Sequence, residues 1–386
     1  MSQPSNSAAQ PLGVAVAGFG WMGRVHTASY RRLAEHFPEL DPPRLVVAAD
    51  TSQARRAHAE RQGFERTVED WSAVLEDPAV DAVSITLPNL MHREVAVAAA
   101  QAGKHVWVEK PVGLGLEDTE VVASAVREAG VLSAVGFCYR FAPAVQHARE
   151  LIAAGAIGSV THYRATFLAD YASDPRTAAS WRFRRAEAGS GALGDLMAHS
   201  VDMTHFLVGP IARLSGRTAT VIGRRPAQAG EGTHFTRGES GELVDVENED
   251  WASALIEFSS GVVGSLEASR VIVGPHVRMR FDVHGSEGAL GWDFERMNEL
   301  ERFRPGDDAG YTRVAAGPSH PGFERFQPGA GMAMSYDDLR VLEAANFLSA
   351  LRDGEQRAPG LDEMVATARV LAAVERSAAT GAWESV

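Results

Sequence analysis

The chain of 386 residues is long enough for two domains with separate cores, and its hydrophobic content of 45% is typical of a globular protein. Its net charge of −13, without any run of basic residues interleaved with aromatic ones, disfavours nucleic-acid partners, and its single cysteine, Cys138, excludes an internal disulfide framework. Residues 1–11 form a polar tail without the basic start and apolar stretch of a signal peptide, and no apolar run approaches the roughly 18 residues of a membrane span, so we expect a soluble, cytoplasmic protein.

A glycine-rich turn follows the first apolar run of the chain. The run that begins at Leu12 leads directly into Gly18, Gly20 and Gly23, and a helical pattern begins at about Trp21. The first glycine permits a tight turn, the second lets the backbone approach a pyrophosphate, and the third lets the helix pack close to the strand. The helix then directs its free amide groups at the phosphates. This context predicts a dinucleotide site in preference to a structural turn.

A second apolar strand, Arg44–Asp50, ends in a carboxylate. In a dinucleotide-binding fold this position meets the adenosine ribose, where Asp50 would accept hydrogen bonds from the hydroxyls and repel a 2′-phosphate. The sequence therefore favours NAD over NADP. Arg55 and Arg56 follow closely and either support a phosphate or are solvated residues of the next helix.

The third strand, Val80–Leu87, is followed by Pro88 and Asn89 at its carboxyl end, where open α/β sheets bind ligands. Asn89 is predicted to cap the helix that carries His92. Whether it also contacts the cofactor is left open by the sequence.

A short strand, His105–Val108, leads into Glu109, Lys110 and Pro111. Proline restricts the backbone beside Lys110, and a cis Pro111 would aim the ammonium group into the crevice. A surface ion pair between the two charged neighbours is the alternative interpretation. The location beside the ligand-binding edge of the sheet favours a functional lysine.

The strand and helix alternation continues through a helix at Glu117–Ala129 and a strand at Val131–Phe137, after which another helix begins. We therefore expect a nucleotide-binding domain at 12–145 and a second domain at 146–386.

In the second domain, a strand at Ser159–Ala169 precedes a polar stretch that contains Trp181 and Arg182. An indole face suits the apolar face of a pyranose ring and a guanidinium suits its hydroxyls, so these two side chains could wall a sugar pocket. The alternative is a loop anchor packed on the sheet.

The segment Gly191–Leu207 holds a carboxylate and a histidine at helical spacing. Asp195 and His199 are four residues apart, so on an α-helix they share one face and could meet directly. A carboxylate on one imidazole nitrogen would fix the tautomer and leave the other nitrogen free as a base. Asp202 and His205 raise a metal-site alternative, but no dense cluster of further ligands accompanies them, so we expect no metal.

The remaining chain predicts antiparallel strands and two helices. Glycine, serine and asparagine turns separate β-rich runs at Asp250–Phe258, Gly261–Arg270, Val277–His284 and Gly288–Phe294. A glycine- and proline-rich stretch, Asp307–Gly331, predicts a loop over the site, with His320 as a substrate candidate. Helical periodicity follows at Ser335–Arg352 and Leu361–Ala373.

Three segments, GFGWMG at 18–23, TLPNLMHREVAVAAAQAGKHVWVEKP at 86–111 and GALGDLMAHSVD at 191–202, resemble the glucose-fructose oxidoreductase and inositol dehydrogenase family in order and spacing. The resemblance implies a Rossmann domain followed by an α/β domain with a large, mostly antiparallel open sheet. It also implies NAD(P)-dependent chemistry on sugars and cyclic polyols, and a homotetramer or homodimer built on that sheet.

Together these observations predict an NAD-dependent dehydrogenase that oxidises a secondary hydroxyl. His199 would take the hydroxyl proton, Asp195 would orient His199, and Lys110 would stabilise charge on the reacting oxygen. The alternatives are an NADP-linked ketone reductase and a non-catalytic NAD-binding regulator. The predicted cofactor contacts are Gly18, Phe19, Gly20, Trp21, Met22, Gly23, Asp50, Arg55, Leu87, Pro88, Asn89, His92, Glu109, Lys110 and Arg140. The predicted substrate contacts are Lys110, Tyr139, Trp181, Arg182, Asp195, His199 and His320.

Overall fold

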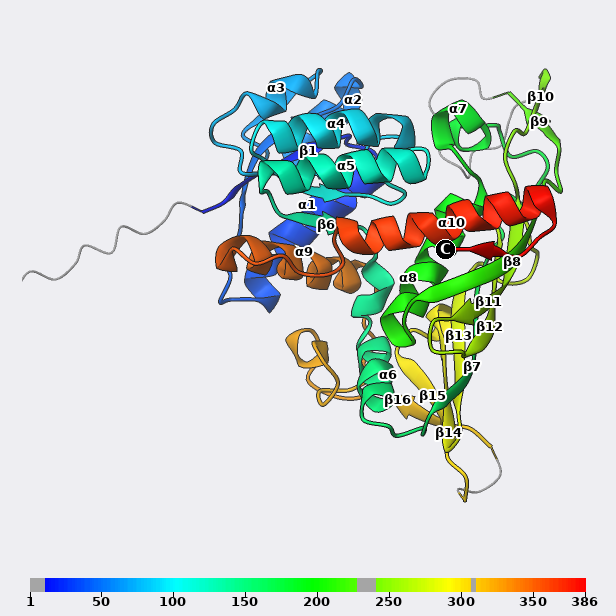
Figure 1. The fold of residues 1–386 in the computed structure, drawn as a ribbon. Coiled ribbons are helices and arrows are strands. Elements are labelled where there is room, and N and C mark those ends of the chain that lie inside the picture. The colour runs from blue at the N-terminus through cyan, green and yellow to red at the C-terminus, as the bar shows by residue number, and fades with distance from the viewer. Residues whose placement is uncertain (1–10, 228–240, 307–309) are drawn as a thin grey trace, which may run out of the picture.

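The computed structural model describes residues 11–227, 241–306 and 310–386. The polar tail expected at 1–11 therefore lies, apart from its last residue, outside the described residues. Two sheets of different construction dominate the molecule (Figure 1).

The first sheet has six parallel strands in the order β3-β2-β1-β4-β5-β6. The strands are β1 (Gly13–Ala17), β2 (Arg44–Ala49), β3 (Arg66–Val68), β4 (Ala82–Ile85), β5 (His105–Val108) and β6 (Ser133–Val135). The crossover helices are α1 (Trp21–His36), α2 (Gln53–Arg61), α3 (Ser72–Leu75), α4 (Asn89–Gln101) and α5 (Leu116–Ala129). The central strands β1 and β4 are buried along their whole length, which is why they show no apolar–polar alternation, and the buried Ser84 of β4 is hydrogen-bonded to the Tyr30 hydroxyl. The predicted Rossmann fold is confirmed.

A helix from the far end of the chain completes this core. Helix α9 (Tyr336–Asp353) packs against the six-stranded sheet, where its Val341 and Phe347 share a buried cluster with Tyr30 of α1 and Trp107 of β5. The sequence places this helix in the second half of the chain, but its apolar face covers the first sheet.

The second sheet has nine strands in the order β16-β15-β14-β13-β7-β12-β11-β8-β17. Among the described residues, only the β7–β12 pair of this sheet is parallel, so the expected mostly antiparallel sheet is confirmed. The strands are β7 (Val160–Ala169), β8 (Ile211–Ala219), β11 (Trp251–Phe258), β12 (Val263–Ser269), β13 (Val277–Gly285), β14 (Gly288–Asp293), β15 (Glu299–Phe303), β16 (Thr312–Ala315) and β17 (Glu384–Ser385).

Helices α6 (Pro143–Ala153), α8 (Ala198–Leu207) and α10 (Leu361–Thr380) lie on one face of this sheet (Figure 1). A small group of elements lies at one end of the nine-stranded sheet. It consists of α7 (Arg185–Ala188) and the paired strands β9 (Arg224–Pro226) and β10 (Leu243–Asp245). The domain boundary expected at 145 falls inside α6. No helix in the described part of the chain is long and apolar enough to cross a membrane.

The stretch expected as one loop over the site, Asp307–Gly331, is more structured than its composition indicates. Residues 307–309 lie outside the described residues, but the rest contains strand β16 and a short 3₁₀ turn, Phe323–Arg325. Strand β16 contains the β-branched Thr312 and Val314, and it pairs with β15 at the edge of the sheet.

Candidate active site

The glycine loop has the geometry that a dinucleotide requires. Gly18 has φ +91°, and a Cβ there would lie 2.9 Å from the carbonyl oxygen of Thr86. A Cβ on Gly23 would lie 2.1 Å from the carbonyl oxygen of Gly18, so α1 packs against the loop only because this residue has no side chain. A Cβ on Gly20 would meet nothing within 4 Å. The backbone at Gly20 is thus open to a pyrophosphate at the N-terminus of α1.

Asp50 lies directly after β2 and organises the same loop. Its Oδ2 accepts a hydrogen bond from the Phe19 amide at 2.7 Å, and its Oδ1 accepts one from the Ser52 amide at 2.9 Å. Arg55 lies 3.6 Å from this carboxylate. Arg56 instead donates to the carbonyl oxygen of Asp50 at 2.7 Å, which makes it a structural residue. The position of Asp50 beside the glycine loop fits the ribose contact predicted from the sequence.

Asn89 does not cap helix α4. It is the first residue of the helix, Pro88 is the N-cap, and no side chain caps the end. The Asn89 amide donates to the carbonyl oxygen of Ala188 in α7 at 3.0 Å, so the predicted cap is wrong. The side chain therefore connects α4 to α7, and local sequence could not identify this partner because it lies far along the chain.

His92 is buried and connects the ends of two strands. Its ring nitrogens lie 2.7 Å from the carbonyl oxygen of Leu87 and 2.8 Å from that of Pro111, and the Lys110–Pro111 peptide is cis as expected. Both nitrogens are therefore engaged by backbone. His92 supports the loop that carries Lys110 and has no free nitrogen for the predicted cofactor contact.

The neighbours Glu109 and Lys110 are not paired with each other. Lys110 donates to Asp195, at 2.9 Å to Oδ1 and 2.6 Å to the carbonyl oxygen. Glu109 is buried and accepts from Arg340 at 2.8 Å and from His26 at 3.0 Å. Burial opposes ionisation of Glu109, but Arg340, His26 and Lys110 together outweigh it and hold the pKa of Glu109 below its usual range. The Glu109 side chain is thus held in a buried ion pair, and its cofactor contact stays a prediction.

Asp195 lies in a π-helical turn, Leu193–Met197, that precedes α8. Its Oδ1 binds Lys110, and its Oδ2 accepts a hydrogen bond from the Tyr171 hydroxyl at 2.7 Å. Within the described residues, Asp195 and His199 make no hydrogen bond to each other, so the predicted direct pair is wrong. A π turn is wider than an α turn and shifts the angular spacing that would have aligned the two side chains; such turns occur frequently at functional sites.

His199 lies in an aromatic surround. Its ring centroid is 4.8 Å from that of Tyr139, 5.9 Å from Phe137 and 5.8 Å from Phe167. Burial, followed by the positive charge of Lys110, lowers the pKa of His199 well below 6.5. The imidazole is therefore neutral at neutral pH and able to accept a proton.

Trp181 and Arg182 form a short 3₁₀ turn near Asp195, and the Arg182 guanidinium stacks 4.4 Å from the Trp181 ring centre. Burial raises the pKa of Asp195, but Lys110 and Arg182, in that order, outweigh it and lower the pKa well below its usual range. Asp195 is thus held as a carboxylate between two cations. Asn248 donates to the Arg182 carbonyl oxygen at 2.9 Å and fixes the turn.

Two predicted site residues are engaged elsewhere. Arg140 forms a buried ion pair with Asp202 of α8, and its cofactor contact stays a prediction. His320 packs edge-on against His147 of α6 at 4.5 Å and bonds to Gly317, and it makes no described contact with Lys110. In the described residues, no group of histidine, cysteine, aspartate and glutamate side chains could hold a metal ion.

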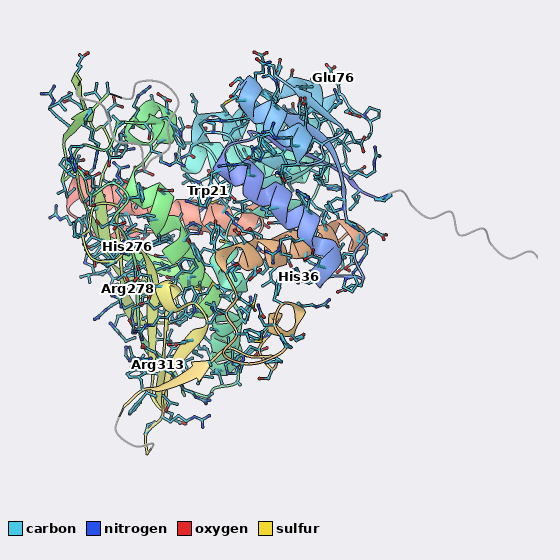
Figure 2. The ribbon with its side chains drawn as sticks, turned by 180° about the vertical axis from the view of Figure 1, so that it is seen from behind. Trp21, His36, Glu76, His276, Arg278 and Arg313 are labelled. Carbon is cyan, nitrogen blue, oxygen red and sulfur yellow. The ribbon has the colours of Figure 1, made fainter. Side chains whose placement is uncertain are left out.

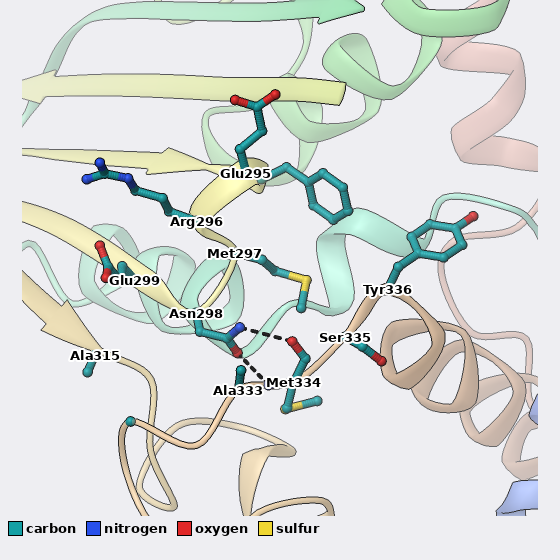
Figure 3. Close-up of a pocket in the computed structure, with 12 residues that line it drawn as sticks. Glu295, Arg296, Met297, Asn298, Glu299, Ala315, Ala333, Met334, Ser335 and Tyr336 are labelled. Atoms are coloured by element: carbon teal, nitrogen blue, oxygen red, sulfur yellow. Dashed lines mark hydrogen bonds between the residues drawn. The ribbon is translucent and has the colours of Figure 1, made fainter. Parts of the chain in front are cut away.

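Tyr171, Phe294 and Tyr336 also lie at the site, and no motif or spacing in the sequence points to them. Phe294 and Tyr336 contact the Tyr139 ring at 4.8 and 6.3 Å and wall a cavity of about 500 Å³ (Figure 3). Tyr139 therefore lies between this cavity and the His199 imidazole. The Tyr336 ring also stacks on Trp21, which marks the end of α1 nearest the larger sheet (Figure 2).

Comparison with known proteins identifies the architecture. A family model described as "Oxidoreductase family, NAD-binding Rossmann fold" matches residues 12–137, and one described as "GFO/IDH/MocA C-terminal domain" matches residues 145–291. Levoglucosan dehydrogenase of Pseudarthrobacter phenanthrenivorans is 35% identical over 385 residues, which are 98% of each chain. The scyllo-inositol 2-dehydrogenase (NAD(+)) of Bacillus subtilis is 33% identical over 278 residues, 72% of each chain. A solved structure of levoglucosan dehydrogenase in complex with NADH and L-sorbose has a TM-score of 0.92 at 35% identity and covers 97% of this chain and 98% of its own. The chain belongs to the GFO/IDH/MocA family of oxidoreductases, with an NAD-binding Rossmann fold at its N-terminus.

Proposed function

We propose that the protein is an NAD-dependent dehydrogenase that oxidises a secondary hydroxyl of a sugar or cyclic polyol to the ketone. The observation that carries this proposal is the cluster of Lys110, Asp195 and His199, in which a cation held by a carboxylate lies beside a buried neutral imidazole. A proton acceptor and a cation are the two groups that alcohol oxidation requires from the protein.

The residues present fit the dinucleotide. The open backbone at Gly20 and the N-terminus of α1 would hold the pyrophosphate, and Asp50 would hold the adenosine ribose. The carboxylate of Asp50 would repel a 2′-phosphate and so favours NAD over NADP. When bound, NAD supplies the acceptor for the hydride that leaves the substrate carbon.

The protein residues then have separate tasks. Neutral His199 takes the hydroxyl proton, and the Lys110 ammonium donates to the reacting oxygen and stabilises the charge that develops there. Asp195 orients Lys110 and not His199, because its carboxylate binds the ammonium and the Tyr171 hydroxyl. This assignment revises the sequence-based role of Asp195.

The proposed substrates follow from the walls of the site and from the relatives. Trp181 and Arg182 beside Asp195 would give a pyranose or cyclitol ring an aromatic face and hydrogen-bond donors. If the sugar is larger than the one ring that contacts Trp181 and Arg182, the cavity on the far side of Tyr139 would admit the rest of it. Because the relatives are named for levoglucosan and inositols, anhydrosugars and inositols are the first candidates.

The test follows reduced-nicotinamide absorbance with a panel of inositols, aldoses and anhydrosugars, with NAD and NADP in parallel. We expect NAD-dependent turnover of at least one class and its loss in His199→Asn. Tight NADH binding without turnover of any compound would support a regulatory protein. Efficient NADPH-dependent reduction of sugar ketones, with little oxidation, would support the reductase instead.

A further inference from the structure

Arg340 is a buried charge outside the proposed reacting groups. It lies on α9, its side chain is 3% exposed, and its guanidinium donates to Glu109 at 2.8 Å. It also donates to the Tyr336 hydroxyl at 3.0 Å, approaches the Met22 sulfur at 3.8 Å and pairs with Glu343. One guanidinium therefore connects α9 with the start of α1 and with the residue before Lys110.

The contacts of Glu109 show that this carboxylate is fixed in place. His26 holds the same Oε1 atom that Arg340 binds. A Cβ on Gly136 would lie 2.6 Å from both carboxylate oxygens, so the carboxylate packs directly against the backbone after β6, where only glycine leaves room for it. Because Lys110 follows in the chain, a fixed Glu109 limits where the Lys110 backbone can lie.

Stability alone is a weak explanation for such a cluster. The attraction within a buried ion pair often offsets only part of the cost of desolvating the two charges. Replacement of such a pair by apolar residues of similar volume is often neutral or stabilising. The remaining Glu343 oxygen, Oε1, has no hydrogen-bond partner, so the cluster is not fully satisfied. A planar guanidinium that binds several groups at once is, however, well suited to setting the relative position of two elements.

We propose that Arg340 is a positioning residue of the dehydrogenase site, which fixes Lys110 through Glu109 and sets the electrostatic environment of His199. This inference rests on the proposed function, because it assigns Arg340 a role in the same reaction. It adds a residue that acts through others and does not touch the substrate.

The electrostatic part of the proposal predicts that substitutions of Arg340 and Glu109 shift the pKa of His199 in opposite directions. The charged groups that act on His199 are Lys110, Glu109, Arg340 and Asp195; Lys110 and Arg340 lower its pKa, and Glu109 and Asp195 raise it. Arg340→Gln removes a positive charge that lowers the pKa of His199, so this pKa should rise. Glu109→Gln removes a negative charge, so the pKa should fall. Arg340→Lys keeps the charge but loses the planar fork, so the pKa should change little.

The experiment measures the pKa of His199 directly, by NMR titration of protein carrying carbon-13 in its histidine rings, with His199→Asn to assign the signal. We expect Arg340→Gln to raise the pKa of His199 and Glu109→Gln to lower it. In pH–rate profiles, the acid limb of oxidation should move the same way. Arg340→Lys should lower kcat about tenfold or more, because Lys110 loses its position. The acid limb of its pH–rate profile should stay where it is in the wild type, because the charge near His199 is retained.

Arg32→Gln is the matched control, because Arg32 also links α1 to α9, through Asp338 at 2.6 Å, at a partly exposed site. It should leave the pKa of His199 and kcat unchanged. Equal pKa values in wild type, Arg340→Gln and Glu109→Gln, or an unchanged kcat in folded Arg340→Lys, would overturn the proposal. If the wild type oxidises no sugar, the proposed function fails, but the titration still tests the effect of Arg340 on His199.

Discussion

Replacement of Lys110 by alanine is the most direct test of the site. The substitution removes a cation that lies 2.9 Å from Asp195 Oδ1 and 2.6 Å from the Asp195 carbonyl oxygen. Loss of one partner from a buried ion pair costs about 3–5 kcal/mol. The Asp195 side chain is 34% exposed and keeps its hydrogen bond from Tyr171, so we expect a smaller loss of unfolding free energy, about 1–2 kcal/mol.

The catalytic effect should be larger than the effect on stability. A preorganised donor at a developing oxyanion is worth about 10²- to 10³-fold in kcat, or about 3–4 kcal/mol. Affinity for NADH should change little, since Lys110 is assigned to the reacting oxygen. Lys110 also lowers the pKa of His199, so its removal should move the acid limb of the residual oxidation to higher pH.

The assay combines steady-state kinetics across pH with NADH titration by fluorescence and with chemical denaturation. Lys104→Ala is the matched control, because the Lys104 ammonium is also partly buried. It donates hydrogen bonds to the carbonyl oxygens of Asp77 and Val80, away from the site. It should retain normal kcat. Collapse of NADH binding in Lys110→Ala, or a kcat near that of wild type, would refute the assigned role.

Three further substitutions probe other parts of the site. Asp50→Ser should shift kcat/KM toward NADP, because it removes the repulsion of a 2′-phosphate and leaves Arg55 close by; wild type that is equally efficient with both cofactors would contradict this. Tyr171→Phe deletes one hydrogen bond to Asp195, so kcat should fall about 3- to 30-fold with KM for NAD unchanged, and an unaltered kcat would exclude a role. The lowered pKa of His199 predicts that oxidation stays near its plateau from neutral pH down to well below 6.5 and then falls. Reduction, which needs the imidazolium, should instead rise only in acid, and His199→Asn should abolish both limbs; a retained profile would identify another base.

The sequence by itself determined the parts of the protein that depend on local pattern. The continuous apolar run at β1 specifies a strand buried on both faces, and Gly18 and Gly23 occupy positions where any side chain would collide with backbone. Lys110 follows the end of β5 within one contiguous motif, so its position in the fold depends only on local sequence. These features need only neighbours a few residues away.

Tertiary structure alone decided which side chains meet. Asp195 binds Lys110 and Tyr171 and not His199, because the π turn alters the spacing that an α-helix would give. Glu109 pairs with Arg340, 231 residues later in the chain, because α9 returns to cover the first sheet. Periodicity specifies which face of an element is buried, but a hydrogen-bond partner depends on where separate elements pack, and that is set by the sum of all their contacts.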